Sequence, residues 1–274
     1  MDVMRNLNMR EDHQSKYVSH TVDANGIAQY SSEENQVWHD LVVRQLPIVT
    51  PRACKEYLDG IKKLQFTKDH IPQCKEISKI LREATGWQLE PVPALIPYDH
   101  FFSLIANKKF PAATFIRRRD EIDYLQEPDI FHEIFGHCPL LTNQAYANFT
   151  ETYGKLGQYA SEEDRIMLAR LYWFTIEFGL INTKDGLRVY GGGILSSKEE
   201  TIYSLESPDP IRKPFDVMEV LRTPYRIDIK QPIYYVIDSF DTLFHLADMD
   251  LLSLIKEARK MGLHKPLYKE KETT

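Results

Sequence analysis

The chain has 274 residues, of which 43% are hydrophobic and 27% are charged, a composition typical of a globular protein with a large core. Its formal net charge of −6 gives no electrostatic reason to bind nucleic acid or an anionic membrane. The three cysteines form no C-x-x-C pair, and neither a signal peptide nor a membrane-spanning run is recognisable. We therefore expect a cytoplasmic protein without nucleic-acid or membrane partners.

Helices dominate the predicted elements. The first is expected to end at Pro47, a third to run through residues 77–84 and stop at Gly86, and a later one to continue through ARLYWFTIEFGLI (169–181). Helix starts are predicted where a capping residue or a proline precedes apolar residues at helical spacing. These starts are the Ser31/Glu34 capping box, Thr50-Pro51, the residues after Asp99, Asn143, Ser161 and a position near residue 250.

The predicted strands are short and few. The prolines of PVPALIP (91–97) indicate a crossing loop, whereas AATFIRR (112–118) and YYVI (234–237) are typical of strands. Asp185-Gly186 predicts a hairpin turn. Together these elements indicate one α+β domain that is mostly helical. The chain divides into an irregular lead-in (1–30), this domain (31–262) and a charged tail (263–274).

The stretch FHEIFGHC (131–138) resembles the H-E-x-x-H motif of zinc proteases, but its second histidine comes one residue late. On a straight α-helix, a spacing of five places His132 and His137 about 140° apart, so they could not share a metal ion. A break in the helix, or a π-type turn, would bring them together. Gly136 and Pro139 make such a break easier. The alternative is that both histidines only form hydrogen bonds in the core.

Glu177 is the only charged residue in LYWFTIEFGLI (171–181). An unpaired carboxylate in a buried helix costs several kcal/mol, so Glu177 needs a partner from elsewhere in the fold, either an arginine or a bound cation. With the two histidines it would complete the two-histidine, one-carboxylate set of non-haem Fe(II) oxygenases. Zinc uses the same donors in hydrolases, so the donor types leave both metals open.

Five stretches of the chain resemble the pterin-dependent aromatic amino acid hydroxylases, and most of all their bacterial phenylalanine hydroxylases. The spacing of five between the histidines is this family's own. The resemblance implies an aromatic amino acid hydroxylase catalytic domain over residues 31–262. The stretches are LIPYDHFF (95–102), FIRRRDEIDYLQEPDIFHEIFGHCPLL (115–141), ARLYWFTIEFGLI (169–181), VYGGGILSS (189–197) and QPIYYVIDSF (231–240).

The resemblance also implies three groups of site residues, a mononuclear Fe(II), a tetrahydropterin co-substrate and O₂. The iron ligands would be His132, His137 and Glu177. The substrate would contact Arg117, which Asp129 holds, and Pro128, Trp173, Gly193 and Ser196. The pterin would contact Leu95, Ile96, Phe101, Glu133 and Tyr172.

Two positions favour L-phenylalanine as the substrate. Trp173 resembles the residue at this position in the phenylalanine and tyrosine hydroxylases. The aliphatic Ile227 lies where tyrosine hydroxylases carry an acidic residue. Leu125-Gln126 replaces the Thr-Pro of the animal members, so contacts near the substrate carboxylate are expected to differ. The expected activity is conversion of L-phenylalanine to L-tyrosine by a monomer or homodimer. The alternatives are a tryptophan or tyrosine hydroxylase, a zinc metallohydrolase, or a fold in which the histidines are structural.

Overall fold

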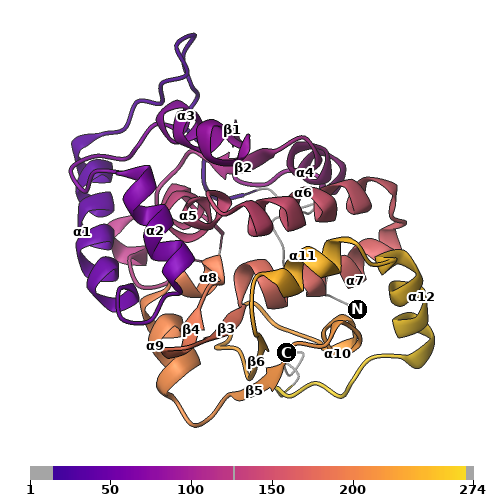
Figure 1. Ribbon diagram of the computed structural model, residues 1–274. Helices are drawn as coiled ribbons and strands as arrows, with labels where there is room; N and C mark the ends of the chain where they lie inside the picture. Colours follow the sequence, from indigo (N-terminus) through magenta and orange to yellow (C-terminus); the bar gives the residue numbers. More distant parts are fainter. Residues whose placement is uncertain (1–14, 126, 270–274) are drawn as a thin grey trace, which may run out of the picture.

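The computed structural model describes residues 15–125 and 127–269, and its elements are mainly helices (Figure 1). Within this part of the chain, no helix has both the length and the apolar character needed to cross a membrane. The helices are α1 (Ser32–Val49), α2 (Lys55–Leu64), α3 (Cys74–Thr85), α4 (Tyr98–Ala106), α5 (Cys138–Leu141), α6 (Gln144–Tyr159), α7 (Glu162–Tyr172), α8 (Gly192–Leu195), α9 (Lys198–Glu206), α10 (Val217–Arg222), α11 (Asp241–Ala247) and α12 (Leu251–Met261). The short 3₁₀ helix η2 (Arg119–Glu121) and the π-helices η3 (His132–His137) and η4 (Trp173–Glu177) complete the helical elements.

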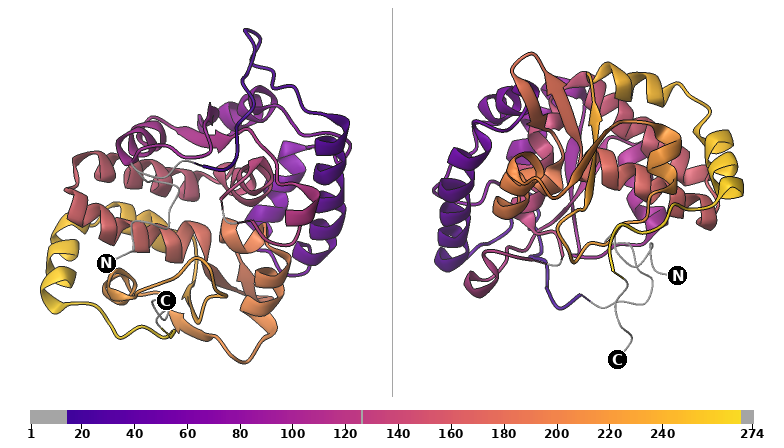
Figure 2. Two further views of the ribbon diagram at one scale, coloured as in Figure 1. Left: turned by 180° about the vertical axis from the view of Figure 1, so that it is seen from behind. Right: turned by 90° about the horizontal axis from the view of Figure 1, so that it is seen from below.

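Two small sheets lie on opposite sides of α6 in Figure 1. The first is the parallel pair β1 (Gln88–Val92) and β2 (Lys109–Ala113), which lies with α3 and α4 at the top of that view. The second sheet has the strand order β4-β3-β6-β5. The right view of Figure 2 shows it between α1, drawn in indigo, and α12, drawn in yellow. Its strands are β3 (Leu180–Thr183), β4 (Gly186–Val189), β5 (Ile211–Pro214) and β6 (Ile233–Ile237).

Most predictions that rested on local capping chemistry are confirmed. Ser31 and Glu34 form the reciprocal capping box that starts α1. Asn143 and Ser161 cap α6 and α7, each accepting a hydrogen bond from a backbone N–H three residues later. The hairpin at Asp185-Gly186 joins β3 to β4, and the predicted strand at 234–237 belongs to β6. The last helix and the end of α3 at Gly86 also lie where the sequence places them.

Other boundaries were predicted wrongly. Helix α1 continues through Pro47 to Val49, because Pro47 lies in the last turn and removes only one backbone donor there. Helix α2 begins at Lys55 rather than at Thr50-Pro51, since residues 50–52 form a turn and Ala53 forms a β-bridge with Val189. The loop predicted at 91–97 gives its first two residues to β1, and the strand predicted at 112–118 lies earlier, at 109–113. The long helix predicted through 169–181 changes to a π-helix at Trp173 and then to strand β3.

An aromatic cluster supports η3 from behind. Phe131 and Phe135 stack with ring centroids 4.9 Å apart, and Trp38 of α1 packs edge-on against Phe131. The Tyr57 hydroxyl of α2 donates a 2.7 Å hydrogen bond to the carbonyl oxygen of Phe135. All four side chains are fully buried in the main core. This packing fixes the segment that carries His132 and His137.

Candidate metal centre

The histidine pair lies on a π-helix. This is one of the two backbone conformations, a broken helix or a π-type turn, that would allow the histidines to share a metal ion. Within η3 the Cys138 N–H bonds to the Glu133 carbonyl oxygen, five residues back. This wider turn brings positions five apart to the same side of the helix. The Nε2 atoms of His132 and His137 are consequently 2.9 Å apart.

Glu177 ends the second π-helix, η4, in which the Phe178 N–H bonds to the Trp173 carbonyl oxygen at 2.8 Å. Its Oε1 lies 3.2 Å from Nε2 of His137, and its Oε2 lies 3.7 Å from Nε2 of His132. One donor atom from each of the three residues lies within 4.8 Å of the others. The carboxylate that lacked a local partner therefore finds one in the histidine pair, 40 and 45 positions earlier in the chain.

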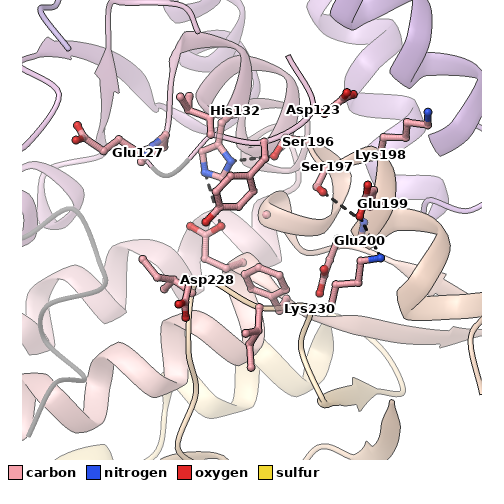
Figure 3. Close-up of a pocket in the computed structure, with 18 of the residues that line it drawn as sticks. Asp123, Glu127, His132, Ser196, Ser197, Lys198, Glu199, Glu200, Asp228 and Lys230 are labelled. Carbon is pink, nitrogen blue, oxygen red and sulfur yellow. Dashed lines mark hydrogen bonds and ion pairs between the residues drawn. The ribbon is translucent and has the colours of Figure 1, made fainter. Parts of the chain in front are cut away.

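The hydrogen bonds of Ser196 define the tautomer of His132. The Ser196 hydroxyl donates to the Gly192 carbonyl oxygen at 2.9 Å, so it can only accept from Nδ1–H of His132, also at 2.9 Å (Figure 3). The Nε2 atom of His132 then carries a lone pair. Burial lowers the pKa of His132 to about 4, which keeps the ring neutral at neutral pH.

Electrostatics in this space suit a cation. Burial alone would raise the pKa of Glu177, but His137 and His132 outweigh it and lower the pKa, so the group is a carboxylate. Nδ1 of His137 has no hydrogen-bond partner among the described residues. Two imidazole nitrogens and a buried carboxylate that converge in this way are a fitting donor set for Fe(II), and the remaining positions around such an ion would be free for other ligands.

Two glycines allow the backbone to approach the histidines. A Cβ atom on Gly192 would lie 2.4 Å from Nδ1 and Cε1 of His137, and one on Gly136 would lie 2.7 Å from the Gly192 carbonyl oxygen. Gly136 does not have a positive φ angle. Its role is therefore to let η3 and α8 approach closely, rather than to supply the backbone flexibility that its place before His137 suggested.

Arg117 and Asp129 form a buried ion pair beside the histidines. The carboxylate of Asp129 accepts three hydrogen bonds from Arg117: from Nε at 2.8 Å, from Nη2 at 3.0 Å and from the Arg117 backbone N–H at 2.9 Å. It also accepts the backbone N–H of His132 at 3.0 Å, so one carboxylate orients both Arg117 and the start of η3. Burial would raise the pKa of Asp129, but Arg117 prevails and lowers it. Arg117 also lines the adjacent cavity.

In the described part of the chain, two cavities border the predicted metal ligands, and the larger of these two, about 450 Å³, opens beside His132 and Glu177. Five of the six predicted substrate residues line it, and Asp129 is buried behind Arg117. Figure 3 shows Glu199 and Lys230 paired at its edge, with a 3.0 Å separation between Oε2 and Nζ. Lining residues that the sequence did not assign to the site include Arg44, Phe178 and Glu200, and no local pattern marks them. Gln126, which was expected to alter this region, lies outside the described residues.

A smaller cavity, about 80 Å³, lies on the other side of the three predicted ligands. Ile96, Phe101, Glu133 and Tyr172 line it as the resemblance implied, whereas Leu95 does not. Burial, reinforced by the charges of Glu177 and Asp129, raises the pKa of Glu133 well above its usual value. The two cavities share a wall made of Pro128, His132 and Glu177.

Comparison with known proteins decides the family. The profile of the family described as biopterin-dependent aromatic amino acid hydroxylase matches residues 8–249. This chain belongs to that family. The phenylalanine-4-hydroxylase of Pseudomonas aeruginosa is 55% identical to it over 258 residues, which cover 94% of this chain and 98% of that protein.

Solved hydroxylase structures share the fold. The apo structure of the cold-active phenylalanine hydroxylase from Colwellia psychrerythraea 34H matches with a TM-score of 0.90 and 55% identity, over 91% of this chain and 97% of that one. The phenylalanine hydroxylase of Chromobacterium violaceum, with bound iron(III) and the oxidised cofactor 7,8-dihydrobiopterin, matches with a TM-score of 0.82 and 45% identity. That match covers 89% of this chain and 90% of that one. The predicted α+β fold and family are confirmed.

Proposed function

We propose that this hydroxylase converts L-phenylalanine to L-tyrosine with O₂ and a tetrahydropterin at a mononuclear non-haem Fe(II) centre. The observation that carries the proposal is the convergence of His132, His137 and Glu177 at the place where two cavities share a wall, to which His132 and Glu177 belong. A metal held there would face one small molecule on each side. The names of the similar bacterial proteins support phenylalanine as the substrate and a biopterin as the cofactor.

We assign the three facing donors to the iron. When bound, Fe(II) and the tetrahydropterin together supply the activation of O₂. The protein's own contribution is to fix the donors: Ser196 orients His132, and Asp129 orients the start of η3. Loss of a hydrogen bond of this kind to a metal ligand typically lowers metal affinity 10- to 100-fold, which corresponds to a free energy on the order of 1–3 kcal/mol.

We assign the larger cavity to the amino acid. The guanidinium of Arg117 suits a carboxylate because it is planar and because Asp129 holds it through Nε and Nη2, which leaves further N–H groups on Nη1 and Nη2 as donors. Trp173, Pro128 and His132 would enclose the aromatic ring, with Gly193 and Ser196 near the substrate backbone. The cavity also holds Ile227, and an aliphatic side chain there leaves no charge for a substrate hydroxyl to contact. This favours phenylalanine over tyrosine as the substrate.

We assign the smaller cavity to the pterin. Phe101 offers an aromatic face, and Ile96, Tyr172 and the buried Glu133 surround it. Leu95 remains a predicted contact that the lining of this cavity does not support.

We also propose a cytoplasmic location, which three free and fully or almost fully buried thiols support. The proposed assembly is a monomer or homodimer. Size-exclusion chromatography with light scattering would distinguish the two, and a tetramer would contradict both.

Anaerobic reconstitution tests the activity. The metal-free protein is loaded with Fe(II) or, in a parallel sample, with Zn(II), and is given phenylalanine and a tetrahydropterin before ¹⁸O₂ is admitted. Only the iron sample should form tyrosine, and its new hydroxyl should carry ¹⁸O. Glu177→Ala should abolish both iron binding and tyrosine formation. The control is Glu162→Ala, which removes an exposed carboxylate on the helix that leads into η4 and should leave iron binding and tyrosine formation unchanged. Turnover with zinc alone, or full activity in Glu177→Ala, would overturn the assignment.

A further inference from the structure

The QPIYYVIDSF stretch (231–240) begins with a buried glutamine that lines neither of the two cavities beside the metal ligands. Gln231 is only 1% exposed, and its side chain makes three hydrogen bonds. Its Oε1 accepts the indole N–H of Trp173 at 3.0 Å. Its Nε2 donates to the carbonyl oxygens of Arg226 at 2.7 Å and of Ile229 at 3.0 Å. The carboxamide thus joins Trp173 to the segment 226–230.

The partners of Gln231 permit one orientation of the carboxamide only. An indole N–H can only donate, so it requires the oxygen, and backbone carbonyls can only accept, so they require the nitrogen. A flipped amide would lose all three bonds and leave buried polar groups unpaired. The backbone is held as well, because the Gln231 N–H donates to Oε1 of Glu200 at 3.0 Å and the Tyr234 hydroxyl donates to the same oxygen. Gln231 is therefore a rigid support for the indole.

Both elements that Gln231 joins are walls of the larger cavity. Trp173 forms one part of the lining, and residues 227–230 form another, with Ile227 among them. Glu200, which anchors the Gln231 backbone, also reaches the lining and is labelled in Figure 3 near Lys230. The position of the indole relative to residue 227 consequently depends on one buried side chain.

Aromatic packing alone would not fix the indole. Phe178 and Tyr225 stack on Trp173 with ring centroids 4.3 and 4.5 Å away and interplanar angles of 29° and 13°. Stacked rings tolerate a range of lateral offsets, so they restrain the tilt of the indole more than its sliding within the ring plane. A hydrogen bond to N–H is directional and stops that sliding.

We propose that Gln231 is a positioning residue for substrate selection: by holding the indole N–H of Trp173, it sets the width of the ring pocket and disfavours a bicyclic ring. The proposal rests on the proposed function, because it takes the larger cavity to be the amino acid site. Gln231 does not reach the cavity itself, so its effect passes through Trp173. The bonds to residues 226 and 229 keep the carboxamide in place for this task.

The test is Gln231→Met, which keeps the length of the side chain but removes all three hydrogen bonds. The ratio of kcat/KM for L-phenylalanine to that for L-tryptophan should fall about five-fold, the change that corresponds to a typical buried hydrogen bond. The fall should appear in KM rather than in kcat, as a higher KM for L-phenylalanine and a lower KM for L-tryptophan, with iron content per chain unchanged. Ser78→Ala is the control: it removes a buried hydroxyl that bonds to Cys74 and Leu89, remote from the pocket, and should lower the melting temperature without changing the ratio.

A double-mutant cycle identifies the route. In a Trp173→Phe background the indole N–H is absent, so adding Gln231→Met should change the ratio by less than two-fold. An equal fall in both backgrounds, or no fall in the wild-type background, would overturn the proposal. If the wild-type protein makes no tyrosine, the proposed function fails instead, so the two failures are distinguishable.

A measurement on the wild-type protein guards against a variant that does not fold. The three indole N–H signals can be resolved by NMR after ¹⁵N labelling and assigned to Trp38, Trp87 and Trp173 by single replacement with phenylalanine. The Trp173 signal should exchange slowly with solvent and should shift when phenylalanine binds. Exchange at the rate of an exposed indole would refute the hydrogen bond that carries the proposal.

Discussion

Replacement of Asp129 by asparagine is the most direct test of how the ion pair organises the site. Asp129 is completely buried and accepts four hydrogen bonds, three from Arg117 and one from the backbone of His132. An asparagine has one acceptor oxygen, and its NH₂ group would face donors that also carry hydrogen. The substitution therefore leaves Arg117, itself 6% exposed, as a buried charge without its partner carboxylate.

The magnitude follows from this burial. Breaking a buried pair by removing one partner costs about 3–5 kcal/mol. For a chain of this length each kcal/mol lowers the melting temperature by about 2 °C, so we expect a decrease of about 6–10 °C. KM for phenylalanine should rise because Arg117 is no longer held toward the substrate carboxylate. The factor by which KM for phenylalanine rises should exceed the factor by which kcat falls.

Calorimetry and steady-state kinetics check this expectation against Asp120→Asn. Asp120 pairs with Arg118 at 3.3 Å, but both side chains are about 70% exposed, so its loss should change stability by no more than about 0.5 kcal/mol. If Asp129→Asn melts within 1 °C of the wild type, or if both variants lose the same stability, the buried pair does not have the role assigned to it.

The stability difference between wild type and Asp129→Asn should also depend on pH. The pKa of Asp129 in the folded protein lies below its ordinary value of 3.8, because Arg117 outweighs the effect of burial. Its contribution is therefore fully present above the unfolded pKa and is lost as the pH falls through the folded pKa. Unfolding free energies of the two proteins should differ by a constant amount from pH 6 to 8 and converge below pH 4. A difference that grew toward acid would refute the sign of this reasoning.

Three further expectations concern the metal. Ser196→Ala should weaken Fe(II) binding about 10- to 100-fold in competition titrations without substrate, since His132 loses the bond that orients it; unchanged affinity would contradict the tautomer argument. Gly192→Ala should displace His137, whose ring atoms lie 2.4 Å from the added Cβ, and should give folded protein with little bound iron; normal iron content would contradict the close approach. Anaerobic Fe(II) at 100 times its dissociation constant should stabilise the wild type by about 2.7 kcal/mol, and a chelator should reverse this; no shift in melting temperature would show that the ion does not bind the folded state.

Features that depend on a few neighbouring residues could be read from the sequence. Ser31, Asn143 and Ser161 cap helices because their hydroxyl or amide oxygen reaches a backbone N–H three residues later, whatever the remainder of the fold does. The same is true of the hairpin at Asp185-Gly186. The histidine pair was also informative, because its spacing allowed a shared metal ion only on a broken helix or on a π-type turn, and the structure has the π-type turn.

Features that depend on distant packing could not be read in this way. Strand β1 exists because residues 88–92 pair in parallel with 109–113 across an intervening helix, which overrides the prolines in the stretch. Helix α1 tolerates Pro47 because only one donor is lost near its end. Arg44 reaches the larger cavity from α1, 73 positions before Arg117, and no pattern around either residue links them.

The two π-helices show why local and distant information had to be combined to find the site. In η3 the hydrogen bond to a carbonyl five residues back marks the wider turn that places His137 on the side of His132, and the same bonding pattern in η4 ends at Glu177. Each helix gives up part of its regular α-helical hydrogen bonding, and each carries at least one of the three converging donors. Such a pair of irregularities would only weaken an ordinary core, so their coincidence at one point indicates selection for metal binding rather than for stability. Gln231 is a comparable case outside the metal centre. It is a buried polar side chain 58 positions from Trp173, and the proposal that Trp173 borders the substrate gives its three satisfied hydrogen bonds a role.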